Sequence, residues 1–372
     1  MVETRESTYQ RRLAALQASL PAAGIDLLAL AVTDNLRYAL GGYAPTGDER
    51  FCALLITPTG LAFIVPSLNA DQARANVAVP MHTYQDAEGP QAAIAAALGA
   101  LGATAASTIA VDEEMRADHL LVLQATLPSA SFQLSGTVVA PLRSRKDADE
   151  IARLQAAAAT ADAGVEAVFA ASRPGVTELE LVEIASAAMR HAGAEEIVFA
   201  TVAAGPHTAL PHHHSDATAL QAGDVLLVDI GSRLNGYCSD ITRMAIVGGA
   251  PPDAEYARVH AVLEEASRAA QAVARPGARA REVDAAAREV IAKAGYGDYF
   301  IHRTGHGLGL SIHEPPYITS ADDLVLESGM VFSIEPGIYL PGRFGVRLEE
   351  IVYLDAEGAH VLSTLPRAVR FG

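Results

Sequence analysis

Cysteine and positive charge are both scarce in this chain. Only two of its 372 residues are cysteines, and they form no CxxC pair. This usage favours reduced thiols and a cytoplasmic protein over a disulfide framework. Lysine and arginine number 27 against 44 acidic residues, which gives a formal charge of −17. Binding to a phosphate backbone depends on cationic side chains, so this balance argues against a nucleic-acid partner.

No segment is suited to secretion or to a membrane. The N-terminus, MVETRESTYQRR, is charged and has no apolar core of the kind found in signal peptides. The longest apolar stretch, residues 92–111, is mostly alanine and is interrupted by glycine, serine and threonine. It predicts an alanine-rich helix followed by a short strand, and we expect no membrane partner.

The length predicts two domains, each with its own core. Residues 1–140 carry the signals of a small α/β domain: a helix over 11–20, a buried strand in IDLLALAV, and two strands around a turn at Pro58 and Gly60. This region holds no cluster of histidine, cysteine and acidic residues in a metal-binding setting. We interpret it as a packing or oligomerisation domain that rims an active site.

The remaining residues, 141–372, alternate helical and strand signals. Helices are expected over 142–173, 178–191, 253–273 and 280–294. Strands lie between and after them. Two helix pairs that alternate with strand pairs indicate an internal duplication of an α-α-β-β unit, so the chain as a whole is assigned to the α+β class.

Four acidic residues and one histidine in this second domain have the chemistry of a site for two metal ions. They are Asp229, Asp240, His306, Glu335 and Glu349. Four carboxylates balance two divalent cations, and one neutral imidazole completes a ligand set suited to manganese, cobalt or zinc. Two such ions about 3.5–4 Å apart can hold a hydroxide and polarise a carbonyl group, which is the chemistry of amide hydrolysis.

The two aspartates are predicted to converge on one face of a β-hairpin. Asn235-Gly236 is a strong two-residue turn signal between two apolar strands. Around that turn Asp240 lies opposite Gly231, and Asp229, two residues from Gly231, shares its face. The two carboxylates are then diagonal neighbours about 7–8 Å apart at the backbone, which suits a shared metal pair.

The two glutamates are predicted to repeat this arrangement on two strands around a turn at 341–343. Glu335 follows an apolar run and precedes Pro-Gly, where a strand ends. Glu349 and its neighbour Glu350 lie on opposite faces of their strand. Alternation alone leaves open which of these two is the ligand, and Glu350 is the alternative.

Histidines gather near these acids. His306 lies in the glycine-rich segment RTGHGLGL, where missing side chains let the backbone approach a ligand closely. Three more are consecutive in LPHHHSD, and in an extended segment either His212 and His214 or His213 alone would face a site. Neutral imidazoles there would donate hydrogen bonds to a developing oxyanion. Outside these segments, we interpret His207 and His302 as structural.

These segments together resemble the pita-bread metallopeptidases, family M24, which include methionyl aminopeptidase, aminopeptidase P and prolidase. The matching motifs are, in order, VDIG, SDITR, GHGLGL-x-x-HE-x-P, IEPG and VRLEE. TDNLRYALGGY resembles the N-terminal domain of prolidases and aminopeptidases P, and LRSRKDADEIARL resembles their linker helix. The resemblance implies a pita-bread catalytic domain over 141–372, preceded by a creatinase/prolidase-type domain over 1–140.

The resemblance also implies a role for each matching residue. The ligands of two metal ions, with manganese expected and cobalt or zinc as alternatives, would be Asp229, Asp240, His306, Glu335 and Glu349. Glu335 would also move a proton for a bridging hydroxide, while His212 and His313 would stabilise the tetrahedral intermediate. Small peptides with proline at the second position would be the substrates, and the protein would be a homodimer.

One position departs from the family's pattern. Several prolidases carry an arginine just after HE-x-P that is thought to bind the carboxylate of a dipeptide, and here that residue is Tyr317. Arg343 in the hairpin turn and Arg347 beside Glu349 are the next arginines that could bind a carboxylate through two hydrogen bonds. Without such a contact, longer Xaa-Pro-Yaa peptides would be accepted.

The expected activity is therefore that of an Xaa-Pro dipeptidase. The alternatives are an aminopeptidase P that acts on longer peptides and, more remotely, a non-catalytic binding protein on the same scaffold. Methionyl aminopeptidase is disfavoured because such enzymes need little beyond the catalytic half. Creatinase-like relatives are disfavoured because they lack the metal ligands.

Overall fold

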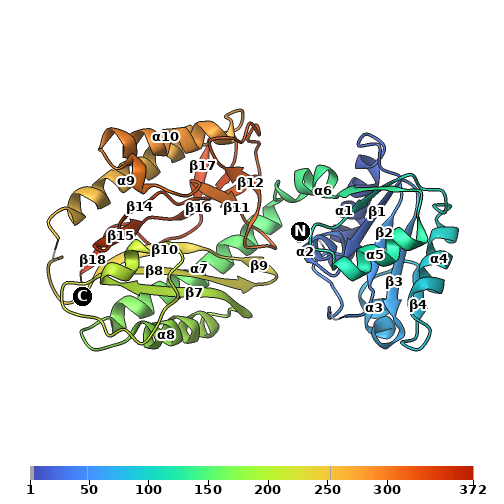
Figure 1. Ribbon diagram of the computed structural model, residues 1–372, viewed down its shortest axis with the longest axis horizontal. Helices are drawn as coiled ribbons and strands as arrows, with labels where there is room; N and C mark the ends of the chain where they lie inside the picture. Colours follow the sequence, from blue (N-terminus) through green and yellow to red (C-terminus); the bar gives the residue numbers. More distant parts are fainter. Residues whose placement is uncertain (1–3, 48, 252, 372) are drawn as a thin grey trace. The chain divides into compact units, whose positions relative to one another are not determined.

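The computed structural model describes residues 4–47, 49–251 and 253–371 (Figure 1). The chain divides into two compact units, Met1–Arg143 and Ser144–Gly372. Among the described residues, no helix combines the length and apolar character that crossing a membrane requires.

The first unit is built on a six-stranded sheet in the order β4-β3-β2-β1-β5-β6. Its strands are β1 (Leu27–Ala31), β2 (Ala53–Ile56), β3 (Leu61–Pro66), β4 (Met81–Tyr84), β5 (Thr108–Val111) and β6 (Ser131–Leu134). Its helices are α1 (Arg5–Ser19), α2 (Asp34–Ala39), α3 (Ala70–Asn76), α4 (Gln91–Ala100), α5 (Ala117–Thr126) and α6 (Gly136–Arg143), with a 3₁₀ turn η1 (Ser67–Asn69). Strand β1 is buried at every position because Leu28 and Leu30 pack into one core while Leu27 and Ala29 pack into another. Both faces of this sheet are therefore covered.

The helices and strands predicted for this unit are present, with one boundary shifted. The two strands around Pro58 and Gly60 are β2 and β3, paired antiparallel, and the alanine-rich segment forms α4 followed by β5. Helix α1 begins at Arg5 rather than at residue 11, because the Thr4 side chain accepts a hydrogen bond from the amide of Ser7 and caps it.

A buried acidic residue, Asp112, follows β5 and accepts hydrogen bonds from polar side chains of the TDNLRYALGGY segment. The Thr33 hydroxyl donates to its Oδ2 at 2.6 Å, and the Asn35 amide donates to its Oδ1 at 3.3 Å. Burial raises the pKa of Asp112 from 3.8 to about 6, and the hydrogen bonds from the Thr33 hydroxyl and the backbone amide of Glu114 offset only part of that effect.

The raised pKa of Asp112 makes stability depend on pH. The folded state binds this proton more tightly than the unfolded state, so its contribution is present at low pH and is lost as pH rises through about 6. Relative to Asp112→Asn, the wild-type free energy of unfolding should therefore fall by about 1.4 kcal/mol between pH 5 and pH 7. Denaturant titrations at three pH values measure this, with Asp71→Asn, at a fully exposed side chain, as the control. A difference that is constant with pH would contradict it.

The second unit contains two helix pairs, each followed by strands (Figure 1). The helices are α7 (Ala148–Ala171), α8 (Glu178–His191), α9 (Tyr256–Val273) and α10 (Ala280–Lys293). The strands are β7 (Glu196–Ala204), β8 (Val225–Leu234), β9 (Tyr237–Cys238), β10 (Ile241–Ile246), β11 (Gly305–Gly307), β12 (Glu314–Ile318), β13 (Val331–Ile334), β14 (Gly337–Leu340), β15 (Phe344–Arg347), β16 (Glu350–Leu354), β17 (Ala359–Val361) and β18 (Arg370–Phe371). They form sheets in the orders β18-β10-β8-β7, β12-β11-β13-β16-β17 and β14-β15, and β9 pairs with β8. Two 3₁₀ turns complete the unit, η2 (Gly205–Ala209) and η3 (Gly297–Tyr299).

Helix boundaries in this unit follow their caps. Helix α8 spans the predicted residues 178–191, and Thr177 and Glu180 form a capping box at its start. Helix α7 begins at Ala148 rather than at residue 142, because Asp147 and Glu150 form a second capping box there. The predicted linker helix is therefore shorter than the charged segment suggested.

Strand β8 lies between two cores, which explains its continuous apolar sequence VLLV. Leu226 and Val228 pack with α7 and α8, whereas Val225 and Leu227 pack with α9, α10 and the strands of the second half. Side chains alternate along a strand, so Asp229 continues the row of Val225 and Leu227. This places its carboxylate on the inner face, between the two halves of the unit.

Candidate metal centre

The first two acids are arranged by the β8–β10 hairpin. Asn235 and Gly236 have φ angles of 51° and 82°, which a two-residue hairpin turn requires. The strands pair Leu234 with Tyr237 and Asp229 with Thr242. Asp229 and Asp240 are therefore diagonal neighbours, in the register that the turn predicted.

The other two acids lie at a break between two strand pairs. Strand β13 pairs with β16, and β14 pairs with β15 in the same register. Between the two strand pairs the ladder is interrupted, and Glu335 lies opposite Glu349 at this point. The amide of Glu335 donates instead to the carbonyl of Thr304 at 2.8 Å, and that of Glu349 donates to the carbonyl of Thr242 at 3.4 Å. The predicted pair of continuous strands is thus two short pairs, and the break releases both glutamates from the ladder.

All five expected metal ligands line one cavity of about 640 Å³. They are Asp229, Asp240, His306, Glu335 and Glu349. The Nε2 atom of His306 is 3.3 Å from Oε1 of Glu335 and 3.6 Å from Oδ2 of Asp240. Ligand atoms of Asp240, His306 and Glu349 all lie within 4.8 Å of one another. This spacing fits side chains that share metal ions.

The charges of this cluster are unbalanced. The pKa values of Asp240 and Glu349 are raised well above their usual range, first by burial and then by the neighbouring carboxylates. Burial also raises the pKa of Glu335 to about 7. Arg347 is the buried cation of the group and contacts Asp229. Four carboxylates outnumber the guanidinium groups of Arg347 and Arg303 in the same cavity, which leaves an excess of negative charge that suits divalent cations.

His306 is held in the form that binds metals. Burial lowers its pKa to about 3, so the imidazole is neutral. Its Nδ1 is 3.1 Å from the carbonyl oxygen of Gly307, and a proton on Nδ1 leaves Nε2 free to face the acids.

The glycines around His306 serve the sheet rather than a ligand. A Cβ on Gly305 would lie 1.8 Å from the carbonyl oxygen of Ser333, and one on Gly307 would lie 2.5 Å from that of Pro315. Strand β11 therefore needs glycine to fit between β12 and β13. The predicted close approach of the backbone is real, but it is to neighbouring strands.

Three polar side chains that the sequence did not single out orient the acids. The Thr242 hydroxyl donates to Oε2 of Glu349 at 2.7 Å and accepts from Nε of Arg347 at 3.1 Å. The Ser333 hydroxyl donates to Glu335 at 3.1 Å and accepts from the amide of His306 at 2.9 Å. Tyr339 accepts a hydrogen bond from Arg347 at 2.9 Å. Such contacts fix ligand orientation.

The remaining candidate histidines also reach the cavity. His212 and His313 line it, as do His213, His214 and His302. The ring of His313 is 4.1 Å from that of His306, and burial lowers its pKa. Residues 212–214 form a turn and loop rather than a strand, so the predicted alternation does not apply and all three line the cavity. Burial lowers the pKa of His302 to about 4, and its Nε2 is 2.9 Å from the Tyr339 hydroxyl.

Glu349 and Glu350 are separated as alternation requires. Glu350 is outside the cavity lining and forms a buried ion pair with Arg243 at 2.9 Å. Glu349 is the one that lines the cavity.

Of the three residues expected to bind substrate, only Arg347 lines the cavity. Arg343 is exposed and pairs with Asp253 and Glu255, and neither Arg343 nor Tyr317 is part of the cavity lining. Arg347 lines the cavity but is occupied by Asp229.

The structure identifies a further candidate, Arg303, which the sequence analysis did not select. It lines the cavity, and its guanidinium lies over the ring of Tyr317, 4.9 Å from the ring centroid. Burial has the largest effect on the pKa values of His306, His313 and Glu335, and the charge of Arg303 also acts on all three, so Arg303 lies near the ligand cluster. In the sequence, the position of Arg303 in RTGHG, three residues before His306, could have indicated that it lies near the site.

Comparison with known proteins places both parts of the chain in known families. The model of metallopeptidase family M24 matches residues 152–356, and that of the creatinase/prolidase N-terminal domain matches residues 12–145. A probable dipeptidase, PepE, of Mycobacterium tuberculosis is 40% identical over 96% of this chain and 95% of its own length. An Xaa-Pro dipeptidase of Lactobacillus helveticus is 37% identical, over 85% of this chain and 87% of its own.

A solved structure shows the same two-unit fold. The recombinant prolidase of Thermococcus sibiricus superposes with a TM-score of 0.91 at 35% identity, covering 98% of this chain and 99% of that one. The α+β fold class, with a pita-bread domain after a creatinase/prolidase-type domain, is confirmed. The chain belongs to metallopeptidase family M24.

Proposed function

We propose that this protein is a metal-dependent Xaa-Pro dipeptidase. The proposal rests on one observation: the five expected metal ligands line one cavity, and the cationic side chains there do not balance their carboxylates. These ligands are Asp229, Asp240, His306, Glu335 and Glu349. Relatives named Xaa-Pro dipeptidase or prolidase, similar over most of the chain, support it.

The five side chains would hold two divalent ions, and manganese, cobalt and zinc all suit this donor set. Bound there, the ions would supply a Lewis acid and lower the pKa of water. The hard carboxylate majority favours manganese among the three.

Several groups in the cavity are also placed for proton transfer and charge stabilisation. Glu335 lines the cavity beside His306, where its carboxylate can take up and return a proton during the reaction. His313, kept neutral by burial, and His212 can donate hydrogen bonds to the substrate carbonyl oxygen as it gains charge. The Ser333 hydroxyl holds Glu335 in place for this role.

Arg303 is proposed to bind the carboxylate of the dipeptide. Within the described residues its guanidinium has a stacking contact with Tyr317 and no ion-pair partner, while lining the cavity. Stacking on Tyr317 leaves the edge of the guanidinium open for a two-bond contact with a carboxylate. Tyr317 would then orient the arginine rather than replace it.

Removing this charge should affect only substrates that carry a carboxylate at proline. Arg303→Met keeps an apolar stack on Tyr317 and should raise KM for Xaa-Pro about 10- to 100-fold, with little change in kcat. The matched substrate is Xaa-Pro-amide, which lacks the carboxylate and should show no such increase. If Arg343 binds the carboxylate instead, Arg343→Met will show the selective loss and Arg303→Met will not.

The function itself is tested by substrate length. Steady-state rates on Xaa-Pro and Xaa-Pro-Yaa peptides, each with manganese, cobalt or zinc, should favour the dipeptide. Preference for the longer peptides would support the alternative of an aminopeptidase P. No hydrolysis of either by the metal-loaded protein would support a binding protein on this scaffold.

A homodimer in the cytoplasm completes the proposal. Both cysteines, Cys52 and Cys238, are buried as thiols, which agrees with a reducing compartment. Sedimentation analysis of the full chain tests the dimer.

A further inference from the structure

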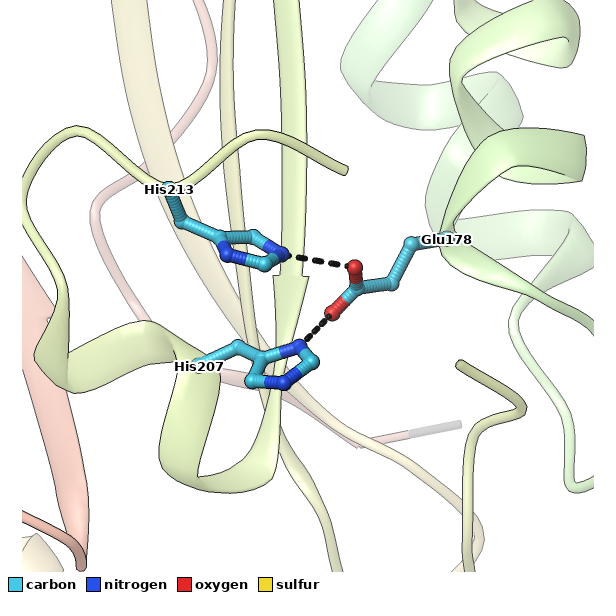
Figure 2. A group of neighbouring side chains, drawn as sticks. All are labelled: Glu178, His207 and His213. Atoms are coloured by element: carbon cyan, nitrogen blue, oxygen red, sulfur yellow. Dashed lines mark hydrogen bonds and ion pairs between the residues drawn. The ribbon is translucent and has the colours of Figure 1, made fainter. Parts of the chain in front are cut away.

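A second group of metal-binding side chains adjoins the cavity. Glu178, at the start of α8, has a side chain with no exposed surface. Its Oε1 is 2.9 Å from Nδ1 of His207 and its Oε2 is 2.7 Å from Nε2 of His213 (Figure 2). The two imidazole rings lie 4.3 Å apart and both turn a nitrogen toward the carboxylate (Figure 2).

The backbone holds this carboxylate in place. The amide of Ala204 donates to its Oε1 at 2.8 Å, and the amide of Asp216 donates to its Oε2 at 3.0 Å. Carboxylates that bind metals are commonly fixed by such hydrogen bonds, which also leave each oxygen a free lone pair. In Glu178 these lone pairs face the two histidines.

The charge of Glu178 is not balanced by lysine or arginine. Within the described part of the chain, its ion-pair partners are His207 and His213 alone. A carboxylate removed from water is costly unless a cation compensates it. A bound metal ion would compensate it without requiring either imidazole to be protonated.

The donor set and its spacing fit such an ion. Two imidazoles and one carboxylate are a known ligand set of zinc, with bonds of about 2.0–2.2 Å that place ligand atoms about 3–3.5 Å from one another. The observed nitrogen–oxygen distances of 2.9 and 2.7 Å need a small outward movement of each ring. The His207 side chain is 30% exposed, which leaves room for that movement and for water as a fourth ligand.

We propose that Glu178, His207 and His213 form a site for one divalent ion of the zinc class, separate from the carboxylate-rich centre. Two nitrogen ligands select a softer ion than the four carboxylates do. The site joins the start of α8, the turn η2 and the loop that carries His212. Its ion would therefore stiffen that loop from outside the proposed catalytic cluster.

Metal counting tests this site independently of hydrolysis. The full chain carrying Asp240→Asn and Glu349→Gln, which disable the carboxylate-rich centre, is dialysed against zinc and analysed by mass spectrometry. We expect about one zinc per chain, and close to none after adding His207→Asn. The asparagine can still donate a hydrogen bond to Glu178, so only the imidazole ligand is lost. His191→Ala, at an exposed histidine of the same helix, is the control and should keep the zinc.

Two results would overturn the proposal. One is the absence of zinc from the doubly substituted protein. The other is zinc that remains after His207→Asn, which would place the ion elsewhere, either in the histidine segment or among Asp229, His306 and Glu335. Should the double variant fail to fold, zinc-edge anomalous diffraction from wild-type crystals decides. A peak among the three side chains supports the site, and its absence in zinc-soaked crystals refutes it.

Discussion

Asp240→Asn is expected to reduce hydrolysis of Xaa-Pro dipeptides by about 1,000-fold or more, which corresponds to about 4 kcal/mol of activation free energy. The substitution preserves size but removes one of the four negative charges that would hold the ions. Burial raises the pKa of Asp240, and the charges of the neighbouring Glu349, Asp229 and Glu335 raise it further. Initial rates at saturating metal measure the loss.

The same substitution should not destabilise the metal-free protein. Burial and the neighbouring carboxylates raise the pKa of Asp240, so the metal-free wild type must take up a proton at this site on folding near neutral pH. Asparagine carries no such cost, so the melting temperature without metal should be unchanged or higher. Asp298→Asn, at an exposed position in η3, is the matched control and should alter neither rate nor melting temperature. Near-normal turnover by Asp240→Asn would remove Asp240 from the proposed ligand set.

Much of the cluster could be predicted because the acidic residues follow apolar strand segments or lie close to a recognisable turn, where a charged side chain is unusual. Asp229 follows VLLV in a strand whose two faces are both buried. The Asn235-Gly236 turn fixes how the two strands pair, and this pairing makes Asp240 a neighbour of Asp229. Strand alternation says that Glu349 and Glu350 differ but not which one faces inward. The family resemblance implied Glu349, and the structure places Glu349 in the cavity lining and Glu350 in an ion pair with Arg243.

The contacts that could not be predicted join residues far apart in the chain. Thr242 reaches Glu349 and Arg347 reaches Asp229 across more than 100 positions, and neither pairing follows from local pattern. The break beside Glu335 also arises from such contacts, because its amide bonds to Thr304 rather than to the opposite strand.

The histidines show the same limit. His207 was interpreted as structural because a lone histidine usually is, and nothing in the sequence links it to Glu178, 29 positions away. The capping box explains the position of Glu180 in the first turn of α8 but not the buried carboxylate of Glu178. Only the fold brings η2 back to the start of that helix.

Chelation is expected to lower hydrolysis to background, and added manganese or cobalt should restore it. Without metal, repulsion and burial favour protons on Asp240, Glu335 and Glu349, whose pKa values are all raised. Metal binding must therefore displace protons, and with a pKa of about 7 at Glu335 the number released should fall as pH rises from 6.5 to 8.5. Calorimetric titration of the metal-free protein with manganese, in buffers of different ionisation enthalpy, measures that number. Activity that persists after metal loss is confirmed by mass spectrometry, or binding with no proton release at pH 6.5, would contradict a centre built from these acids.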